Sequence, residues 1–310
     1  MNFEKTLKIA WEGLTLNKVR SFLTTLGVII GVAAVIVMLA VSAGAEAEIA
    51  DQINALGANL IMVMPSFQRG GFDRRSGPPP MLEYEDLREI TDQVTGIDGV
   101  SAERNTTQNV KGSGTLEGIS VVGTTPGFPA VRDDELAEGR FITDVDNDRT
   151  NKIVVLGYDI ARELFGDPSN GGGNPVGQSI KVGSVKLTVV GVMEEKGVVG
   201  NTDFDGRLYV PITLVFKKFS NQRFDRDRLG MVSISAESKE AMPSVMDQLN
   251  EEIMQLLGTD PSAPGFMLVT QDSIIDARAS TTETFRNLLA WVAGVSLVVG
   301  GIGIMNIMLV

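Results

Sequence analysis

Two long uncharged runs constrain this chain more than any other feature of its sequence. The first covers residues 21–45 and the second covers residues 287–310, and neither contains Asp, Glu, Lys or Arg. At a rise of about 1.5 Å per residue, a helix of about 20 residues crosses the roughly 30 Å hydrocarbon core of a bilayer. The sequence therefore predicts two transmembrane helices, residues 21–45 and 287–310, on either side of a polar middle region.

Two other interpretations of these runs compete with this one. Ala43, Gly44 and Ala45 resemble the cleavage site of a secretory signal peptide, but the first run is longer than the roughly 7 to 15 apolar residues typical of one. A pair of buried core helices is the second alternative. Two such runs flanking a polar middle are hard to bury in a chain of 310 residues, so the membrane interpretation is favoured.

Residues 1–20 predict an amphipathic helix that lies on a membrane surface, because apolar residues recur at helical spacing. Lysines and an arginine precede the first run, and positive charge beside a span is normally retained in the cytoplasm. We therefore expect a cytoplasmic N-terminus and place residues 46–286 outside. The residues expected to lie on this cytoplasmic membrane surface are Phe3, Lys5, Leu7, Lys8, Trp11 and Leu14.

The helical pattern continues beyond the first run, through residues 46–57. A single helix over residues 21–56 would be about 54 Å long, roughly 24 Å more than the hydrocarbon core needs. The excess predicts a stalk that projects from the membrane, with a glycine as its C-terminal cap. The stalk residues are Glu46, Ile49, Ile53, Leu56 and Gly57. Residues 271–286 predict a return stalk from a weaker signal, because Ser280 to Thr282 are poor helix formers.

The middle region, residues 58–270, predicts an α+β domain. Strand patterns occur near residues 60–65, 118–125, 152–157, 207–212, 231–236 and 265–270, and residues 179–193 read as a hairpin that turns near Val182 to Ser184. Helical patterns cover residues 82–94, 158–166 and 239–258. We expect two subdomains, with residues 82–225 inserted between the strand near 61 and the strand near 231.

Several functional classes are disfavoured by composition. The net charge of −12 argues against nucleic-acid binding, and the absence of Cys and His removes thiolate or imidazole metal sites and the nucleophile pairs that need them. Residues 172–179 imitate a phosphate-binding loop, but Gln178 stands where its lysine belongs. The acids of 133–135 and 144–148 are interpreted as solvated loops. We expect no catalytic, cofactor or metal site on this chain.

Glycines within the two runs predict close helix packing. Gly27 and Gly31 form a G-x-x-x-G pair, and Gly300, Gly301 and Gly303 crowd the second run. Glycine lets helix backbones approach, so these faces are expected to contact other helices. The alternative that the glycines are merely tolerated in membrane helices stays open.

Several segments together resemble a known family. They are NKVRSFLTTLGVIIGVAAVIVM, INALGANLIMV, LAEGRFIT, NKIVVLGYDIARELFG, NPVGQSIKVGSVKLTVVGVME, LYVPI and SLVVGGIGIMNIMLV. In this order they resemble the permease portion of MacB-type transporters, within the wider FtsX-like group of ABC transporter permeases. The resemblance implies an inner-membrane homodimer with four spans per chain, an extracytoplasmic domain made of a porter-like part and an inserted second subdomain, and an adaptor protein as a partner. It also implies that movement, rather than substrate, passes through the spans.

The chain departs from the family pattern at both ends. MacB itself carries its ATPase on the same chain, whereas Met1 here directly precedes the amphipathic helix, so we expect a separate ABC ATPase subunit that binds ATP and Mg²⁺. Val310 lies inside the second run, so we expect the remaining spans beyond it. A membrane receptor with an outer sensor domain is the alternative of a different class. Within the permease interpretation, export and activation of a cell-wall enzyme both remain open.

Overall fold

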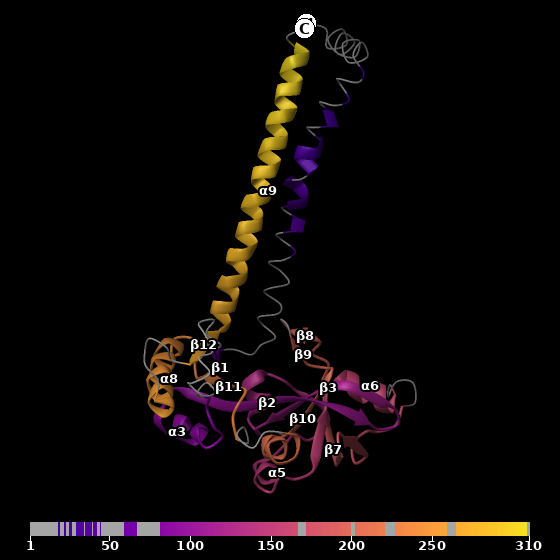
Figure 1. The fold of residues 1–310 in the computed structure, drawn as a ribbon, viewed down its shortest axis with the longest axis vertical. Coiled ribbons are helices and arrows are strands. Elements are labelled where there is room, and N and C mark those ends of the chain that lie inside the picture. The colour runs from indigo at the N-terminus through magenta and orange to yellow at the C-terminus, as the bar shows by residue number, and fades with distance from the viewer. Residues whose placement is uncertain are drawn as a thin grey trace, which may run out of the picture. The chain divides into compact units, whose positions relative to one another are not determined.

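The computed structural model describes residues 59–66, 81–166, 172–199, 202–220, 227–258 and 265–308, together with scattered positions between 18 and 44. The chain divides into two compact units (Figure 1). One consists of Met1–Asp51 with Ile275–Val310, and the other of Gln52–Ile274. We describe each unit by itself.

The unit Gln52–Ile274 is built on one mixed sheet, which has ten strands within the described residues. Their order is β12-β1-β11-β2-β3-β10-β5-β7-β4, with β6 pairing to β2 and β7 beside this path. The strands are β1 Leu60–Pro65, β2 Ile97–Lys111, β3 Thr115–Thr124, β4 Leu136–Gly139, β5 Ile153–Leu156, β6 Ser179–Val182, β7 Val185–Met193, β10 Arg207–Pro211, β11 Met231–Ala236 and β12 Phe266–Thr270. A separate small hairpin joins β8 Val198–Val199 to β9 Thr202–Asp203.

The first half of the sheet, β12-β1-β11-β2, is covered by helices α3 Asp86–Gln93 and α8 Met242–Leu257. Helix α8 is amphipathic, and it buries Met242, Val245, Leu249 and Ile253 along one stripe. These side chains form a core with strand residues such as Ile61 and Ile234. Helix α3 joins the same core. It lies inside the expected insertion 82–225 and packs with α8, which lies outside it.

The second half of the sheet has apolar clusters on two faces. One contains Ile160 and Leu164 of α6 Tyr158–Phe165, with residues of α7 Ile212–Leu214 and of the π-helical turn Val215–Phe219. The other centres on three rings whose centroids lie 5.0 to 6.1 Å apart, those of Phe128, Phe141 and Tyr209. Phe128 begins the short helix α4 Phe128–Arg132, and α5 Asp144–Asp148 follows β4.

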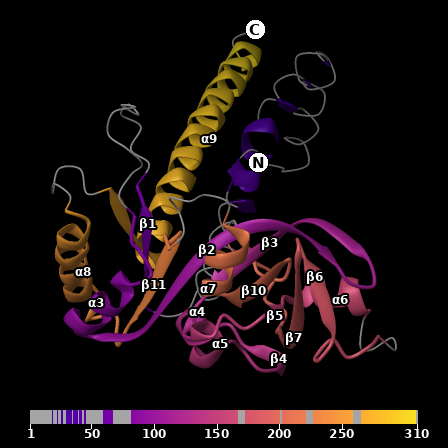
Figure 2. The same cartoon turned by 60° about the horizontal axis from the view of Figure 1, so that its bottom comes forward.

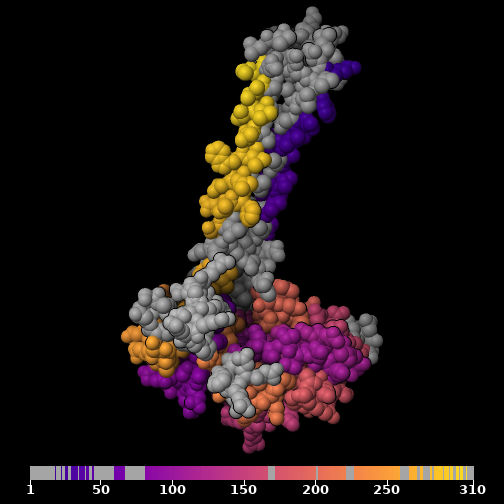
Figure 3. Space-filling model, viewed as in Figure 1, coloured from indigo at the N-terminus to yellow at the C-terminus, as the bar shows by residue number. Residues whose placement is uncertain are grey.

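Strand β2 joins the two halves. Its 15 residues, about 50 Å when extended, pair with β11 over Ile97–Glu103 and with β3 over Glu103–Lys111. Figure 2 shows β2 as a long ribbon that runs from beside β11 toward α6. In the space-filling view magenta residues fill the middle of the unit, and the orange of α8 lies at its left edge (Figure 3). The halves therefore share a continuous ladder.

Helix α9, Gln271–Met308, continues without a break through Ser280, and from Ile275 onward it belongs to the other unit. Several of its apolar side chains are exposed, among them Phe285, Trp291 and Ile302. Among the helices in the described part of the chain, none combines the length and apolar character that crossing a bilayer requires. The two spans therefore stay predictions.

Most of the expected strands and helices of the middle region are confirmed. The hairpin of β6 and β7 turns at Gly183, whose φ of +55° lies in the left-handed region that glycine adopts easily. The loop that imitates a phosphate-binding site leads into strand β6 and not into a helix, as expected. The sequence patterns do not predict the long strand β2, and the division into two subdomains is untested.

Candidate functional site

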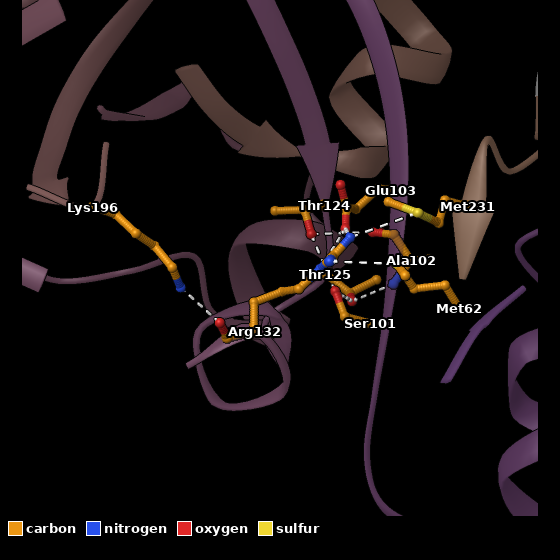
Figure 4. A network of polar contacts seen from close by, with 9 residues as sticks. All are labelled: Met62, Ser101, Ala102, Glu103, Thr124, Thr125, Arg132, Lys196 and Met231. Atoms are coloured by element: carbon orange, nitrogen blue, oxygen red, sulfur yellow. Dashed lines mark hydrogen bonds and ion pairs between the residues drawn. The ribbon is translucent and has the colours of Figure 1, made fainter. Parts of the chain in front are cut away.

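A buried network of charged and polar side chains lies where the two halves of the sheet meet. We call it the α4 junction and define it by Glu103, Arg132 and Lys196 with the thioethers of Met62 and Met231 (Figure 4), together with the adjoining Asp134. Helix α4 carries it because its side chains enter two apolar clusters. Phe128 belongs to the ring cluster of the second half, and Val131 packs with Leu60 and Met62 of β1.

Close backbone approach brings α4 onto β2. A Cβ atom added at Gly99 of β2 would stand 2.9 Å from the Val131 side chain, and one added at Gly127 would stand 2.7 Å from the carbonyl oxygen of Val100. Both distances are below normal contact, so larger residues at either position would push the helix away. Glycine on both surfaces therefore allows Arg132 to reach the strand.

The central contact is an ion pair between Arg132 and Glu103. The Nε and Nη2 groups of Arg132 donate to Oε1 of Glu103 at 3.2 and 2.8 Å, and the two side chains are 6% and 2% exposed. The remaining donors face sulfur, since Nη1 lies 3.7 Å from Sδ of Met62 and Nη2 lies 3.6 Å from Sδ of Met231. One guanidinium thus contacts β2, β1 and β11 together.

Hydroxyl groups fix the backbone beside Glu103. The Oγ1 of Thr124 donates to the carbonyl oxygen of Ala102 at 3.1 Å, and the backbone N–H of Ala102 donates to Oγ1 of Thr125 at 3.1 Å. Ser101 and Thr124 also pair through their hydroxyls at 3.3 Å. Glu103 itself pairs in register with Met231 on one side and Thr124 on the other. The acid therefore occupies the position where both halves hold β2.

Lys196 connects the backbone at the C-terminal end of α4, where Arg132 lies, to the β8–β9 hairpin. Its ammonium donates to the carbonyl oxygens of Arg132 and Asp133 at 2.8 and 2.7 Å, at the negative end of the helix. The backbone N–H groups of Lys196 and Gly197 donate to the two carboxylate oxygens of Asp205 at 3.0 and 2.7 Å. Burial lowers the pKa of Lys196, and the neighbouring carboxylates of Asp134 and Asp133 oppose that shift.

Asp134 is buried, which corrects the expectation of a solvated acid at this position, whereas Asp133 and Glu135 are exposed. Its side chain is 3% exposed, and Oδ2 has no hydrogen-bond partner among the described residues. Burial raises the pKa of this carboxyl to about 6, against the opposing effect of Lys196 and Arg207. The fold rather than the local sequence buries this acid, which follows the C-terminal end of α4 and donates its backbone N–H to the carbonyl oxygen of Pro129 at 3.0 Å.

Asp146 is likewise buried, so the expectation of a solvated acid is wrong for this residue, whereas Asp144 and Asp148 are exposed. Residues 144–148 form helix α5, and Asp146 closes a capping box with Thr143. Burial alone would raise the pKa of Asp146, but hydrogen bonds from Arg140, Asn151 and Thr143 outweigh it and hold the pKa well below its usual range. Asp146 therefore has structural partners in Arg140, Thr143 and Asn151.

The site residues expected from sequence fall largely outside the described residues. That holds for Phe3, Lys5, Leu7, Lys8, Trp11 and Leu14, for Glu46, Ile49, Ile53, Leu56 and Gly57, and for Gly27. Gly31 is described and buried, whereas Gly301 in α9 is exposed, and no described atom lies within 4 Å of the position that a Cβ atom would take there. Gly300 and Gly303 also lie in α9. The roles assigned to these residues stay predictions.

The described residues contain no cluster of three acids that could hold a metal ion. The expectation that the chain needs no cofactor is untested. Sequence reasoning missed the α4 junction altogether. Its members come from positions 62, 103, 132, 134, 196 and 231, and no local motif connects such distant residues.

Comparison with known proteins gives one consistent answer. The family profile of the MacB-like periplasmic core domain matches residues 21–252. The macrolide export ATP-binding/permease protein MacB of Bdellovibrio bacteriovorus is 36% identical over 303 residues, which are 97% of this chain and 45% of that protein. The pyoverdine export ATP-binding/permease protein PvdT of Pseudomonas syringae is 29% identical over 305 residues, 98% of this chain and 44% of that protein. The chain thus spans about half the length of these curated relatives.

Solved structures support the fold of the middle region. The periplasmic region of MacB from Actinobacillus actinomycetemcomitans aligns with a TM-score of 0.58 at 21% identity, covering 73% of this chain and 95% of that one. The extracellular domain of the transporter YknZ from Gram-positive bacteria aligns with a TM-score of 0.53 at 20% identity, covering 68% and 100%. With the profile match over most of its length, the chain belongs to the MacB-type family of ABC transporter permeases that carry the MacB-like periplasmic core domain.

Proposed function

We propose that this chain is the permease part of an ATP-driven exporter, and that its middle region changes conformation when an ABC ATPase hydrolyses ATP. The observation that carries the proposal is the match of residues 21–252 to the MacB-like periplasmic core domain. The relatives' names, which pair ATP-binding with permease, support an ATPase as partner. Because two of them name macrolide and pyoverdine export, small antibiotics, peptides and lipoproteins are the substrate classes to test first.

In this proposal the chain lies in a bacterial inner membrane as a homodimer. Residues 21–45 and 287–310 cross the bilayer, residues 46–286 stand outside, and residues 1–20 lie on the cytoplasmic surface beside a separate ATPase subunit. Residues 46–57 and 271–286 act as stalks that carry movement to the domain. An adaptor protein outside the membrane would receive it. The chain itself has no part in ATP chemistry.

Co-purification of the complete protein from its own host tests this function. We expect an ABC ATPase to accompany it, and we expect ATP hydrolysis in nanodiscs to change when the permease is omitted. A partner ATPase whose phosphate-binding lysine is replaced provides the matched control, because it should bind the permease without hydrolysis. Capture of a kinase in place of an ATPase would favour the receptor alternative, and hydrolysis that ignores the permease would refute the proposal.

A further inference from the structure

The two halves of the domain are joined by β2 and by helix α4. Along β2 the pairing partner changes from β11 to β3, and the two ladders overlap only at Glu103. A strand held on opposite sides over different lengths can twist between them, since sheets accommodate twist readily. Helix α4 spans the same place, with Phe128 in the cluster of one half and Val131 in the cluster of the other.

Arg132 attaches α4 to the first half through three strands at once. Its guanidinium donates twice to Glu103 of β2 and lies beside the sulfur atoms of Met62 on β1 and Met231 on β11. The planar fork of arginine fixes direction as well as distance, which a flexible ammonium does not. Because both charged side chains are almost fully buried, the pair cannot open without leaving an uncompensated charge.

The same C-terminal end of α4 is also attached to the second half, through its backbone. Lys196 donates to the last carbonyl oxygens of the helix, and the adjoining backbone is held by Asp205. The Phe204 ring lies beneath this ammonium, 5.2 Å away, and beneath the guanidinium of Arg207, 4.7 Å away. Contacts therefore run without interruption from β1 and β11, through α4, to the base of the β8–β9 hairpin.

We propose that Arg132 is a positioning residue that locks the two halves into one body, so that displacement of β1 moves the β8–β9 hairpin. This inference rests on the proposed function for the source of the displacement. Strand β1 follows the expected stalk at residues 46–57, and β12, which pairs with β1, runs directly into α9. Without the lock, β1 and β11 would shift while the second half stayed behind.

Distance measurements between spin labels test the lock in the complete protein. Residues 1–310 contain no cysteine, so within them labels attach only at introduced sites. Glu251→Cys on α8 and Glu163→Cys on α6 report between the halves, because both side chains are exposed. Asp92→Cys on α3 with Glu251→Cys gives a reference within the first half. We expect one narrow distance distribution for each pair in the protein with Arg132 intact.

The decisive variant replaces the ion pair by apolar residues, Arg132→Met with Glu103→Leu. Such paired replacements usually keep a protein folded, whereas removing one partner does not. We expect the distribution between the halves to become at least about twofold wider, with the reference pair unchanged and the melting temperature within about 3 °C of the parent. The matched control is Arg140→Met, which breaks the ion pair with Asp146 inside the second half and should leave both distributions narrow.

An unchanged distribution between the halves in the folded paired variant would overturn the proposal. If that variant unfolds, Arg132→Lys replaces it, because lysine keeps the charge but cannot contact all three strands, and the same widening is expected. These distances need no nucleotide, so they test the lock even if no ATPase acts on the chain. With the ATPase present, the distance between the halves can also be measured as nucleotide is added. A nucleotide-dependent shift of that distance that persists in the paired variant would contradict the transmission of movement through Arg132, but not the lock itself.

Discussion

The buried carboxyl of Asp134 makes the free energy of unfolding depend on pH. Its pKa of about 6 lies above the 3.8 of a free Asp, so the folded state binds the proton more tightly than the unfolded state does. Stability from this group is therefore complete below about pH 4 and is lost as pH rises to about 6, a difference of about 3 kcal/mol by pH 7. We expect Asp134→Asn to gain about 1–3 kcal/mol at pH 7.5 and to approach the parent near pH 4. Urea unfolding at both pH values measures this, and an equal effect at both would contradict it.

The buried ion pair makes a second prediction for single residues. Arg132→Met alone leaves Glu103 charged and buried, so we expect a loss of about 3–5 kcal/mol in the free energy of unfolding. Arg140→Met is the control, because Arg140 is 50% exposed and Asp146 keeps its hydrogen bonds from Thr143 and Asn151, so the loss should be smaller than for Arg132→Met. Urea unfolding in detergent compares the two. Equal losses would mean that burial does not set the strength of the Arg132 contact.

Among the elements, β3 packs unusually close to the turn that follows β10. A Cβ atom added at Gly123 would stand 2.4 Å from the Val215 side chain and 3.2 Å from Cα of Ile212. Since the backbone at residue 212 cannot yield as a side chain can, we expect Gly123→Ala to cost about 1–3 kcal/mol. Gly114→Ala is the control, because no described atom lies within 4 Å of its Cβ position. Thermal melting of both variants checks this, and equal melting temperatures would contradict it.

Prediction from sequence succeeded where an element carries its own pattern. The hairpin of β6 and β7 alternates buried and exposed residues, and α8 repeats its apolar residues at helical spacing. It failed for β2, whose sequence IDGVSAERNTTQNVK is mostly polar. Its burial comes from neighbours on both sides, with Ala102 and Glu103 covered by β11, β3 and α4. Tertiary contacts override a weak local signal there.

At the scale of the whole molecule, sequence could indicate an α+β region but not how its parts connect. Strand order depends on pairings between residues far apart, such as Ile61 with Ile234 and Leu208 with Val121, and no local pattern encodes them. The α4 junction exists only because those pairings bring Met62, Glu103 and Met231 together. The expected roles of the glycines and of the stalk depend on residues that lie largely outside the described range.

The proposed topology makes a prediction for the whole chain that does not depend on the details of the fold. Positive charge at Lys5, Lys8, Lys18 and Arg20 should hold the N-terminus in the cytoplasm and residues 46–286 outside. In cells that express the complete protein, we expect Glu163→Cys to react with a membrane-impermeant maleimide before lysis, because that side chain is exposed. Lys5→Cys should react only after lysis. The parent protein, which has no cysteine in this sequence, gives the background. Labelling of Lys5→Cys in intact cells would show that the topology is the reverse of the proposed one. An ATPase in the cytoplasm would then face residues 46–286 instead of residues 1–20.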